Sequence, residues 1–227
     1  MLRAAPSLPG PRPVASLGRL SRGKQAIGAH RARGLTIAQR QGHHPAMSRY
    51  RRSGVGGATY FFTVNTYLRY RILTHPEVRA ALREAIEHVR ETLPFAIDAW
   101  VLMPDHLHAI WTMPRDDAAY GKRWGIIKSH VSQRCGHLLN SDAVRSESRI
   151  RRRELDFWQW RFWEHQIRDD RDFERCVDYI HYNPVKHKLV ERAGEWPYST
   201  FHRFVSRGVY PKNWSADPGM DSGNGGE

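Results

Sequence analysis

The stretch FAIDAWVLMPDHLHAIWTM, residues 95–113, predicts two β-strands joined by a short turn. Residues 95–103 and 106–113 are rich in the β-branched and aromatic side chains that strands favour, and Met103-Pro104-Asp105 between them has turn chemistry. A hairpin of this kind belongs to an antiparallel sheet. Its second strand begins with His106-Leu107-His108, so the segment that sets the fold also carries two potential metal ligands.

The sequence on either side of this hairpin predicts the remaining elements. Thr74-His75-Pro76-Glu77 has the form of a capping box and opens a helix that stops near Pro94. A last helix starts at Asp169 or Asp170 and runs to about Asn183, where Pro184 stops it. A first strand at 59–69 precedes both helices, and a second helix at 120–139 and a fourth strand at 157–168 lie between them.

The order of these elements, β-α-β-β-α-β-α, predicts the fold class. We expect an α+β fold in which an antiparallel β-sheet of about four to five strands has helices packed on one face, as in ferredoxin-like or RRM-like domains. A chain of 227 residues is long enough for one domain with tails. The expected division is a basic leader at 1–46, a single catalytic domain at 47–207 and a flexible tail at 208–227.

The charge of the chain is unevenly distributed. Its formal net charge is +13, and residues 1–46 contribute eight Lys and Arg and no acid. This leader is rich in Gly, Pro and Ser, so we expect disorder, although an Arg-rich segment without acids also fits an organellar transit peptide. The interpretation that we favour is a start site assigned too early, with the protein beginning at Met47. The rest of the chain is moderately basic, which suits a polyanionic partner.

Composition excludes several classes of protein. The two cysteines, Cys135 and Cys176, form no CxxC pair, which argues against a disulfide scaffold and against a cysteine-ligated zinc site. The apolar runs are too short to span a membrane. We therefore expect a soluble protein of a reducing compartment, without a membrane partner.

The spacing of His106 and His108 is informative only in context. The chain has 13 histidines, so about 0.7 pairs at this spacing are expected by chance when matches are counted. On a strand, however, alternate side chains share one face, so both imidazoles can converge on one divalent ion. The alternative is that both histidines pack against a helix or face solvent without binding anything.

A second group of polar residues lies on the last predicted helix. Tyr179 borders its apolar stripe, and Asn183 follows one turn later, where its carbonyl oxygen could complete a metal shell. Because Pro184 disfavours helical geometry at the residue before it, this alignment stays open. Alone, Tyr179 would more often be an aromatic residue at the margin of a core.

Together these residues resemble the REP-associated tyrosine transposases, single-tyrosine transposases of the HUH endonuclease class. The resemblance includes Met103-Pro104, His106-Leu107-His108, Tyr179-Ile180, Asn183-Pro184-Val185 and Leu189-Val190, and covers about 150 residues from near Met47 to WPYST at 196–200. Two features depart from the family pattern: Lys188 stands where glycine is frequent, and the 46-residue leader has no counterpart.

The resemblance implies a function and a role for each site residue. His106 and His108 would bind Mg²⁺ or Mn²⁺ with Asn183 as third ligand, and Tyr179 would be the nucleophile that forms a covalent 5′-phosphotyrosine. The substrate would be single-stranded, hairpin-forming DNA such as repetitive extragenic palindromes, which the enzyme cleaves and rejoins as a monomer or a homodimer. Such a protein would be cytoplasmic, and nucleoid-associated when bound to DNA.

Basic and aromatic residues elsewhere are candidates for DNA contacts. The basic candidates could hold phosphates, and the tryptophans could stack on unpaired bases. Packing in the core is the alternative for the tryptophans, and a solvated loop is the alternative for the basic run. The candidates are Lys122, Arg123, Lys128, Arg134, Arg151, Arg152, Arg153, Trp158, Trp160 and Arg161.

Three other functions compete with the transposase interpretation. A histidine-triad hydrolase needs a third histidine where this chain has Ile110, and a two-motif phosphoesterase needs a second His-x-Thr/Ser motif, which is absent. A non-catalytic nucleic-acid-binding protein that keeps the fold is the remaining alternative.

Overall fold

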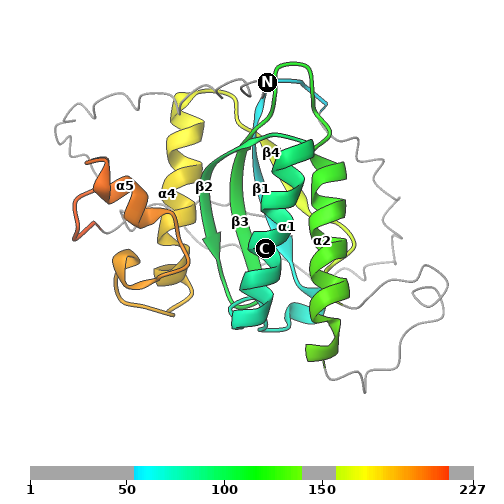
Figure 1. Ribbon diagram of the computed structural model, residues 1–227. Coiled ribbons are helices and arrows are strands. Elements are labelled where there is room, and N and C mark those ends of the chain that lie inside the picture. Colours follow the sequence, from blue (N-terminus) through cyan, green and yellow to red (C-terminus); the bar gives the residue numbers. More distant parts are fainter. Residues whose placement is uncertain (1–53, 140–156, 215–227) are drawn as a thin grey trace, which may run out of the picture. The chain divides into compact units, whose positions relative to one another are not determined.

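The computed structural model describes residues 54–139 and 157–214, and its centre is an antiparallel sheet (Figure 1). Within these residues the sheet has four strands in the order β2-β3-β1-β4. The strands are β1 (Thr59–Asn65), β2 (Ala96–Leu102), β3 (His106–Thr112) and β4 (Trp163–Gln166). The predicted hairpin of β2 and β3 is present, with Leu102 opposite Leu107 next to the turn.

Helices cover the sheet on two sides (Figure 1). On one side lie α1 (Pro76–Thr92) and α2 (Tyr120–Cys135), and on the other α4 (Asp170–Lys186) and the short α5 (Phe201–Ser206). Short 3₁₀ turns occur at η1 (Tyr67–Arg69), η2 (Gly136–Leu138) and η3 (Ala193–Glu195). No helix in the described part of the chain is long and apolar enough to cross a membrane.

The α+β class and the antiparallel sheet are confirmed, with one difference in the arrangement of the helices. We expected them on one face, and they lie on both. The cause is visible in the central strands, whose alternate side chains are buried on each side: Phe62 and Trp111 pack with α1 and α2, while Phe61 and Ile110 pack with α4 and α5. A strand buried on both faces needs a helical layer on each.

Three element boundaries differ from the sequence prediction. The capping box at Thr74 does not form, because His75 is the N-cap residue without a side-chain cap and Pro76 is the first helical residue. The fourth strand is shorter than residues 157–168, since before β4 only Trp158 forms a bridge, to Thr66. Pro184 does not stop α4, which continues to Lys186 and therefore keeps Asn183 helical.

The packed domain also extends beyond residue 207, where we expected the tail to start. Tyr210 is buried, and its ring stacks on that of Phe201 at a centroid distance of 5.5 Å. Trp214 packs against the same cluster. The leader at 1–46 and the tail from residue 215 lie outside the described residues.

Candidate active site

The predicted histidine pair lies on the face of the sheet that α4 covers. His106 and His108 are both fully buried on β3, with ring centroids 4.9 Å apart. Leu107 between them points to the opposite core, with α1 and α2. The alternation of a strand therefore places both imidazoles toward the same helix.

His106 is held from both of its ring nitrogens. Its Nδ1 lies 2.8 Å from a carboxylate oxygen of Asp105, and its Nε2 lies 3.3 Å from Oδ1 of Asn183 on α4. Burial opposes ionisation of Asp105, but the hydrogen bond with His106 and the charge of Arg69 outweigh it and lower the pKa of the carboxyl. An ionised Asp105 accepts a hydrogen bond from Nδ1–H of His106, and in the neutral imidazole the lone pair is then on Nε2, which faces the Asn183 carbonyl.

His108 has one satisfied and one unsatisfied nitrogen. Its Nδ1 lies 2.9 Å from the hydroxyl of Thr63, the residue opposite it on β1. Its Nε2 is buried without a hydrogen-bond partner among the described residues. Complete burial holds the pKa of His108 well below 6.5, and the nearby His106 and His187 act in the same direction. The ring is therefore neutral at pH 7, as metal binding requires.

The tyrosine proposed as nucleophile lies beside this pair. Tyr179 on α4 is half-buried, with its ring centroid 5.2 Å from that of His108 and 5.9 Å from that of Phe61. The ammonium of Lys186, two turns further along α4, lies 5.0 Å from the Tyr179 ring centroid. The structure thus brings Tyr179, Asn183 and both histidines to one place from two elements.

The donor set fits a divalent cation. A neutral His106 that donates through Nδ1 has an acceptor at Nε2. That Nε2 atom faces a second acceptor, Oδ1 of Asn183, at 3.3 Å. Without a cation, a turn of the Asn183 amide relieves this contact. A cation relieves it as well, because donors at about 2.1 Å from one ion lie about 3 Å apart when they subtend a right angle. The unsatisfied Nε2 of His108 is a third potential donor.

Comparison with known proteins identifies the family of the chain. No family model matches the chain. The REP-associated tyrosine transposase of Escherichia coli K12 is 44% identical over 171 residues, which are 75% of this chain and 93% of the relative. A relative assigned to the same family in Haemophilus influenzae is 38% identical over 180 residues, 77% of this chain and 97% of its own. The chain belongs to the REP-associated tyrosine transposases.

A solved structure of a family member has a similar fold and supports this assignment. A REP-associated tyrosine transposase bound to a REP hairpin shares 43% sequence identity with this chain, at a TM-score of 0.64. The match covers 75% of this chain and 93% of that one. The family resemblance that the sequence motifs indicated is therefore confirmed.

A second cluster of potential metal-binding atoms lies between β4 and α4. The sequence analysis did not predict it. His165 of β4, Asp172 and Cys176 place one donor atom each within 4.8 Å of the others. The Asp172 carboxylate already accepts from His165, from the Arg168 backbone and from the Arg175 guanidinium. Burial raises the pKa of the Cys176 thiol to about 12, so it stays protonated at neutral pH. This cluster is an ion-pair network, and it suits a cation less well than the histidine pair.

Two of the predicted DNA contacts, Arg123 and Trp158, are buried in the structure. Arg123 is fully buried. Its guanidinium donates to Asp117 and to the carbonyl oxygens of Leu93 and Pro94. Trp158 is only 5% exposed and packs in the core with α1 and α2. Neither side chain is available to a nucleic acid.

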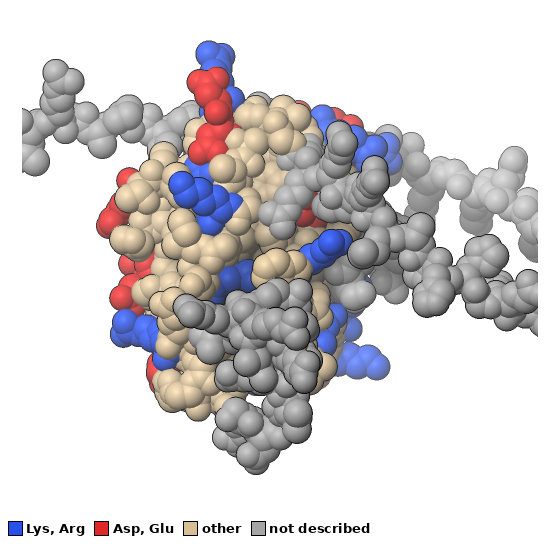
Figure 2. Space-filling model, turned by 90° about the vertical axis from the view of Figure 1, so that its right-hand side faces the viewer, with Lys and Arg blue, Asp and Glu red and all other residues tan. Residues whose placement is uncertain are grey.

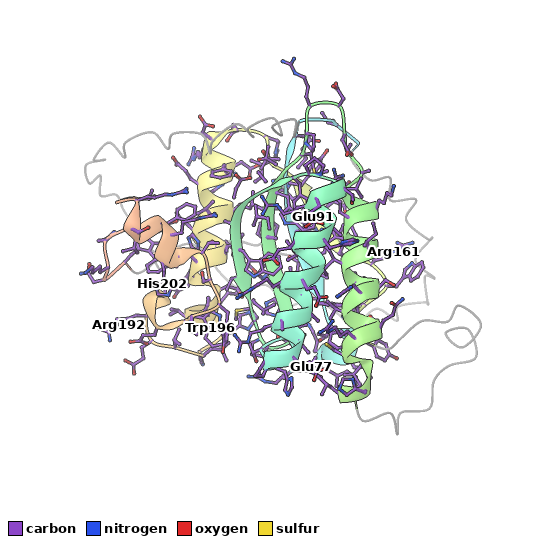
Figure 3. All side chains as sticks on the ribbon, in the orientation of Figure 1. Glu77, Glu91, Arg161, Arg192, Trp196 and His202 are labelled. Atoms are coloured by element: carbon purple, nitrogen blue, oxygen red, sulfur yellow. The ribbon has the colours of Figure 1, made fainter. Side chains whose placement is uncertain are left out.

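The other described candidates lie on or beside α2, across the sheet from Tyr179. Lys122, Arg134 and Arg161 are exposed, and Trp160 is 69% exposed. Lys128 donates to the backbone carbonyls of Gln159 and Trp160, which fixes that segment to α2. Figure 2 shows basic side chains scattered over this side, and Figure 3 shows Arg161 beside α2, away from α4. Arg151, Arg152 and Arg153 lie outside the described residues.

Sequence reasoning missed the residues that orient the site. Asp105 and Thr63 each hydrogen-bond the Nδ1 atom of one histidine, and Lys186 lies over the nucleophile candidate. Asp105 was assigned only to a turn, although a carboxylate directly before a histidine motif is a usable signal. Thr63 gives no local signal, because its pairing with His108 depends on the register of β1 against β3.

Proposed function

We propose that this REP-associated tyrosine transposase is a divalent-metal-dependent endonuclease and strand transferase that acts on single-stranded, hairpin-forming DNA. The observation that supports this most strongly is the convergence of the Tyr179 phenol and the His106–His108 pair within one chain. The solved relative is described as bound to a REP hairpin, which supports the same class of DNA as substrate. A non-catalytic DNA-binding protein with this fold is the alternative.

His106, His108 and Asn183 would hold the ion, either Mg²⁺ or Mn²⁺. A bound divalent ion polarises the scissile phosphate and offsets the negative charge of the transition state. Imidazole is a softer ligand than Mg²⁺ usually selects, so we expect Mn²⁺ to bind more tightly in vitro. Asp105 and Thr63 keep the Nε2 atoms of both histidines directed at the site.

Tyr179 is the proposed nucleophile. Its oxygen bonds to phosphorus as it loses its proton, the bond from phosphorus to the 3′ oxygen breaks, and that oxygen leaves as a protonated 3′-hydroxyl. The 5′ phosphate stays on Tyr179, and a 3′-hydroxyl of another end reverses the reaction. The energy of the phosphodiester is conserved in the linkage, so no nucleotide cofactor is needed. The Lys186 ammonium adds positive charge beside the attacking phenol.

The exposed residues near α2 are proposed as DNA contacts away from the cleaved bond. Trp160 would stack on an unpaired base, and Lys122, Lys128, Arg134 and Arg161 would contact phosphates. Because α2 lies on the opposite side of the sheet from Tyr179, the contacts of these described residues would involve parts of the hairpin remote from the scissile phosphate. Arg151, Arg152 and Arg153, which lie outside the described residues, stay predicted phosphate contacts without an assigned position.

A covalent-adduct assay tests the proposal. Hairpin DNA labelled at its 3′ end is incubated with the full chain and Mn²⁺, and protein-linked label is measured on a denaturing gel. The expected result is an adduct in the wild type that is lost in Tyr179→Phe, in His106→Ala and in EDTA. Tyr182→Phe, a change of the same kind on the same helix, should keep it. Wild-type protein that shifts the DNA without linking to it would support the binding-protein alternative.

A further inference from the structure

We infer that Asp105, held in place by Arg69, is a positioning residue that fixes the tautomer and orientation of His106 for metal binding. The inference rests on the proposed metal site and goes beyond it, since neither residue is a ligand. The Nδ1 atoms of the two histidines have different partners: a carboxylate accepts from His106, while the hydroxyl of Thr63 lies at Nδ1 of His108.

The contact between Asp105 and His106 has the geometry of a charge-assisted hydrogen bond. Nδ1 and the carboxylate oxygen are 2.8 Å apart, and the imidazole is almost completely buried. A carboxylate can only accept, so Nδ1 carries a proton, and in the neutral imidazole the lone pair is then on Nε2. Nε2 faces Oδ1 of Asn183. Without Asp105, nothing in the described residues would force this tautomer on His106.

Asp105 is itself fixed to the end of β1. Its carbonyl oxygen accepts from the backbone N–H of Thr66 at 2.9 Å and from the Thr66 hydroxyl at 2.8 Å. The hairpin turn is closed by the N–H of Met103, which donates to the carbonyl of His106 at 2.9 Å. The carboxylate is therefore presented from a rigid backbone, as a group that orients a metal ligand needs to be.

Arg69 supports the carboxylate from the other side. Its guanidinium lies 3.6 Å from the second oxygen of Asp105 and donates to Oδ1 of Asn65 at 3.1 Å. Arg69 and the preceding Leu68 both have left-handed backbone conformations, with φ of 56° and 49°. Such conformations cost non-glycine residues on the order of 1–3 kcal/mol each and persist where the surroundings demand them. Here the turn brings the guanidinium to the side chains of Asn65 and Asp105.

The test measures binding of Mn²⁺ alone to the metal-free full chain by calorimetry. Removing a carboxylate partner of a metal-ligating histidine typically costs about 10- to 100-fold in affinity. We expect a loss of this size in Asp105→Ala, and affinity close to the wild type in Asp105→Asn, whose amide oxygen still accepts from Nδ1. Asp98→Asn is the matched control, because it removes the same charge from a carboxylate that meets Thr112 at the far end of β3.

A readout of folding separates positioning from a merely structural role. In EDTA, Asp105→Asn should unfold near the wild-type temperature. At a fixed Mn²⁺ concentration the rise in that temperature should be larger for the variant that binds Mn²⁺ more tightly, because the stabilisation follows the logarithm of [Mn²⁺]/Kd. If Asp105→Ala does not fold, Arg69→Gln tests the same chain of contacts from the protein surface and should weaken Mn²⁺ binding severalfold.

The outcomes distinguish this inference from the proposed function. Equal Mn²⁺ affinity in the wild type, Asp105→Ala and Arg69→Gln would overturn the positioning role and leave the metal site intact. Binding that survives in the His106→Ala/His108→Ala double variant and disappears in His165→Ala would place the ion in the other cluster. That result would overturn the proposed metal site and the inference together.

Discussion

Each imidazole of the pair uses one nitrogen for a hydrogen bond within the protein and directs the other into the site. Asp105 and Thr63 occupy the Nδ1 atoms, and Asn183 faces the remaining nitrogen of His106. Burial acts together with these hydrogen bonds. It keeps His108 neutral by lowering its pKa, and it excludes water from both rings. Burial of this kind suits a histidine that is proposed to bind a metal through its free nitrogen.

The His165–Asp172 network makes a stability prediction at the same scale. Burial opposes ionisation of Asp172, but hydrogen bonds from His165, the Arg168 backbone and Arg175 outweigh it, so the folded-state pKa is lowered. A lowered pKa contributes stability above the unfolded value of 3.8 that is lost as pH falls through the folded value. Asp172→Ala should therefore lower the free energy of unfolding by about 3 kcal/mol at pH 7. Urea unfolding should show the difference shrinking below about pH 4, and a difference independent of pH would contradict this account.

At the scale of elements, α4 does most to assemble the site. It carries Tyr179 and Asn183 one turn apart, and its buried residues Val177 and Ile180 fix the helix to the sheet. Pro184 lies inside the helix, and the N–H of His187 donates to the carbonyl of Asn183, which closes the last turn. The helical spacing of the two site residues therefore survives the proline.

The N-terminus of α4 gives a prediction for this element. The Asp169 side chain accepts from the backbone N–H of Asp172 at 2.8 Å, which satisfies one free donor of the first turn. Asp169→Ala should lower the free energy of unfolding by about 1 kcal/mol, and Asp169→Ser should restore most of it. For a domain of this size that is a decrease of about 2–4 °C in Tm, measured by thermal unfolding. No decrease in Tm would show that the cap does not stabilise α4.

At the scale of the whole molecule, the sheet separates two groups of candidate residues that alternate along the sequence. The proposed chemistry lies on the α4 face, and the accessible basic and aromatic candidates lie with α2 on the other. Both faces belong to one chain, so a single copy contains the complete set of His106, His108, Tyr179 and Asn183.

This arrangement predicts that the site works within one subunit. A mixture of His106→Ala and Tyr179→Phe proteins should form no covalent adduct with hairpin DNA, because neither chain has both the ligands and the nucleophile. A mixture of either variant with the wild type should keep the wild-type signal as a control. Adduct formation in the mixture of the two variants would instead indicate that paired copies exchange α4.

The sequence by itself determined the local part of this protein. The period of two along residues 106–112 places both histidines on one face, because this pattern depends only on backbone geometry. The hairpin of β2 and β3 follows from residues 95–113, and the ordered set of motifs between Met47 and residue 200 indicated the family. The i, i+4 alignment of Tyr179 with Asn183 stayed open because of Pro184, and the structure settled it. The leader at 1–46 and the division of the chain into domains stay predictions.

The tertiary structure decided everything that joins distant segments. Only packing determined that α4 lies over the face carrying the histidines, that helices cover both sides of the sheet, and that Asp105 and Thr63 meet the imidazoles. It also determined that Arg123 is buried in an ion pair, which a basic residue on a predicted helix does not reveal. The physical reason is that periodicity fixes which side chains share a face, whereas the partner of that face depends on the fit of whole apolar surfaces.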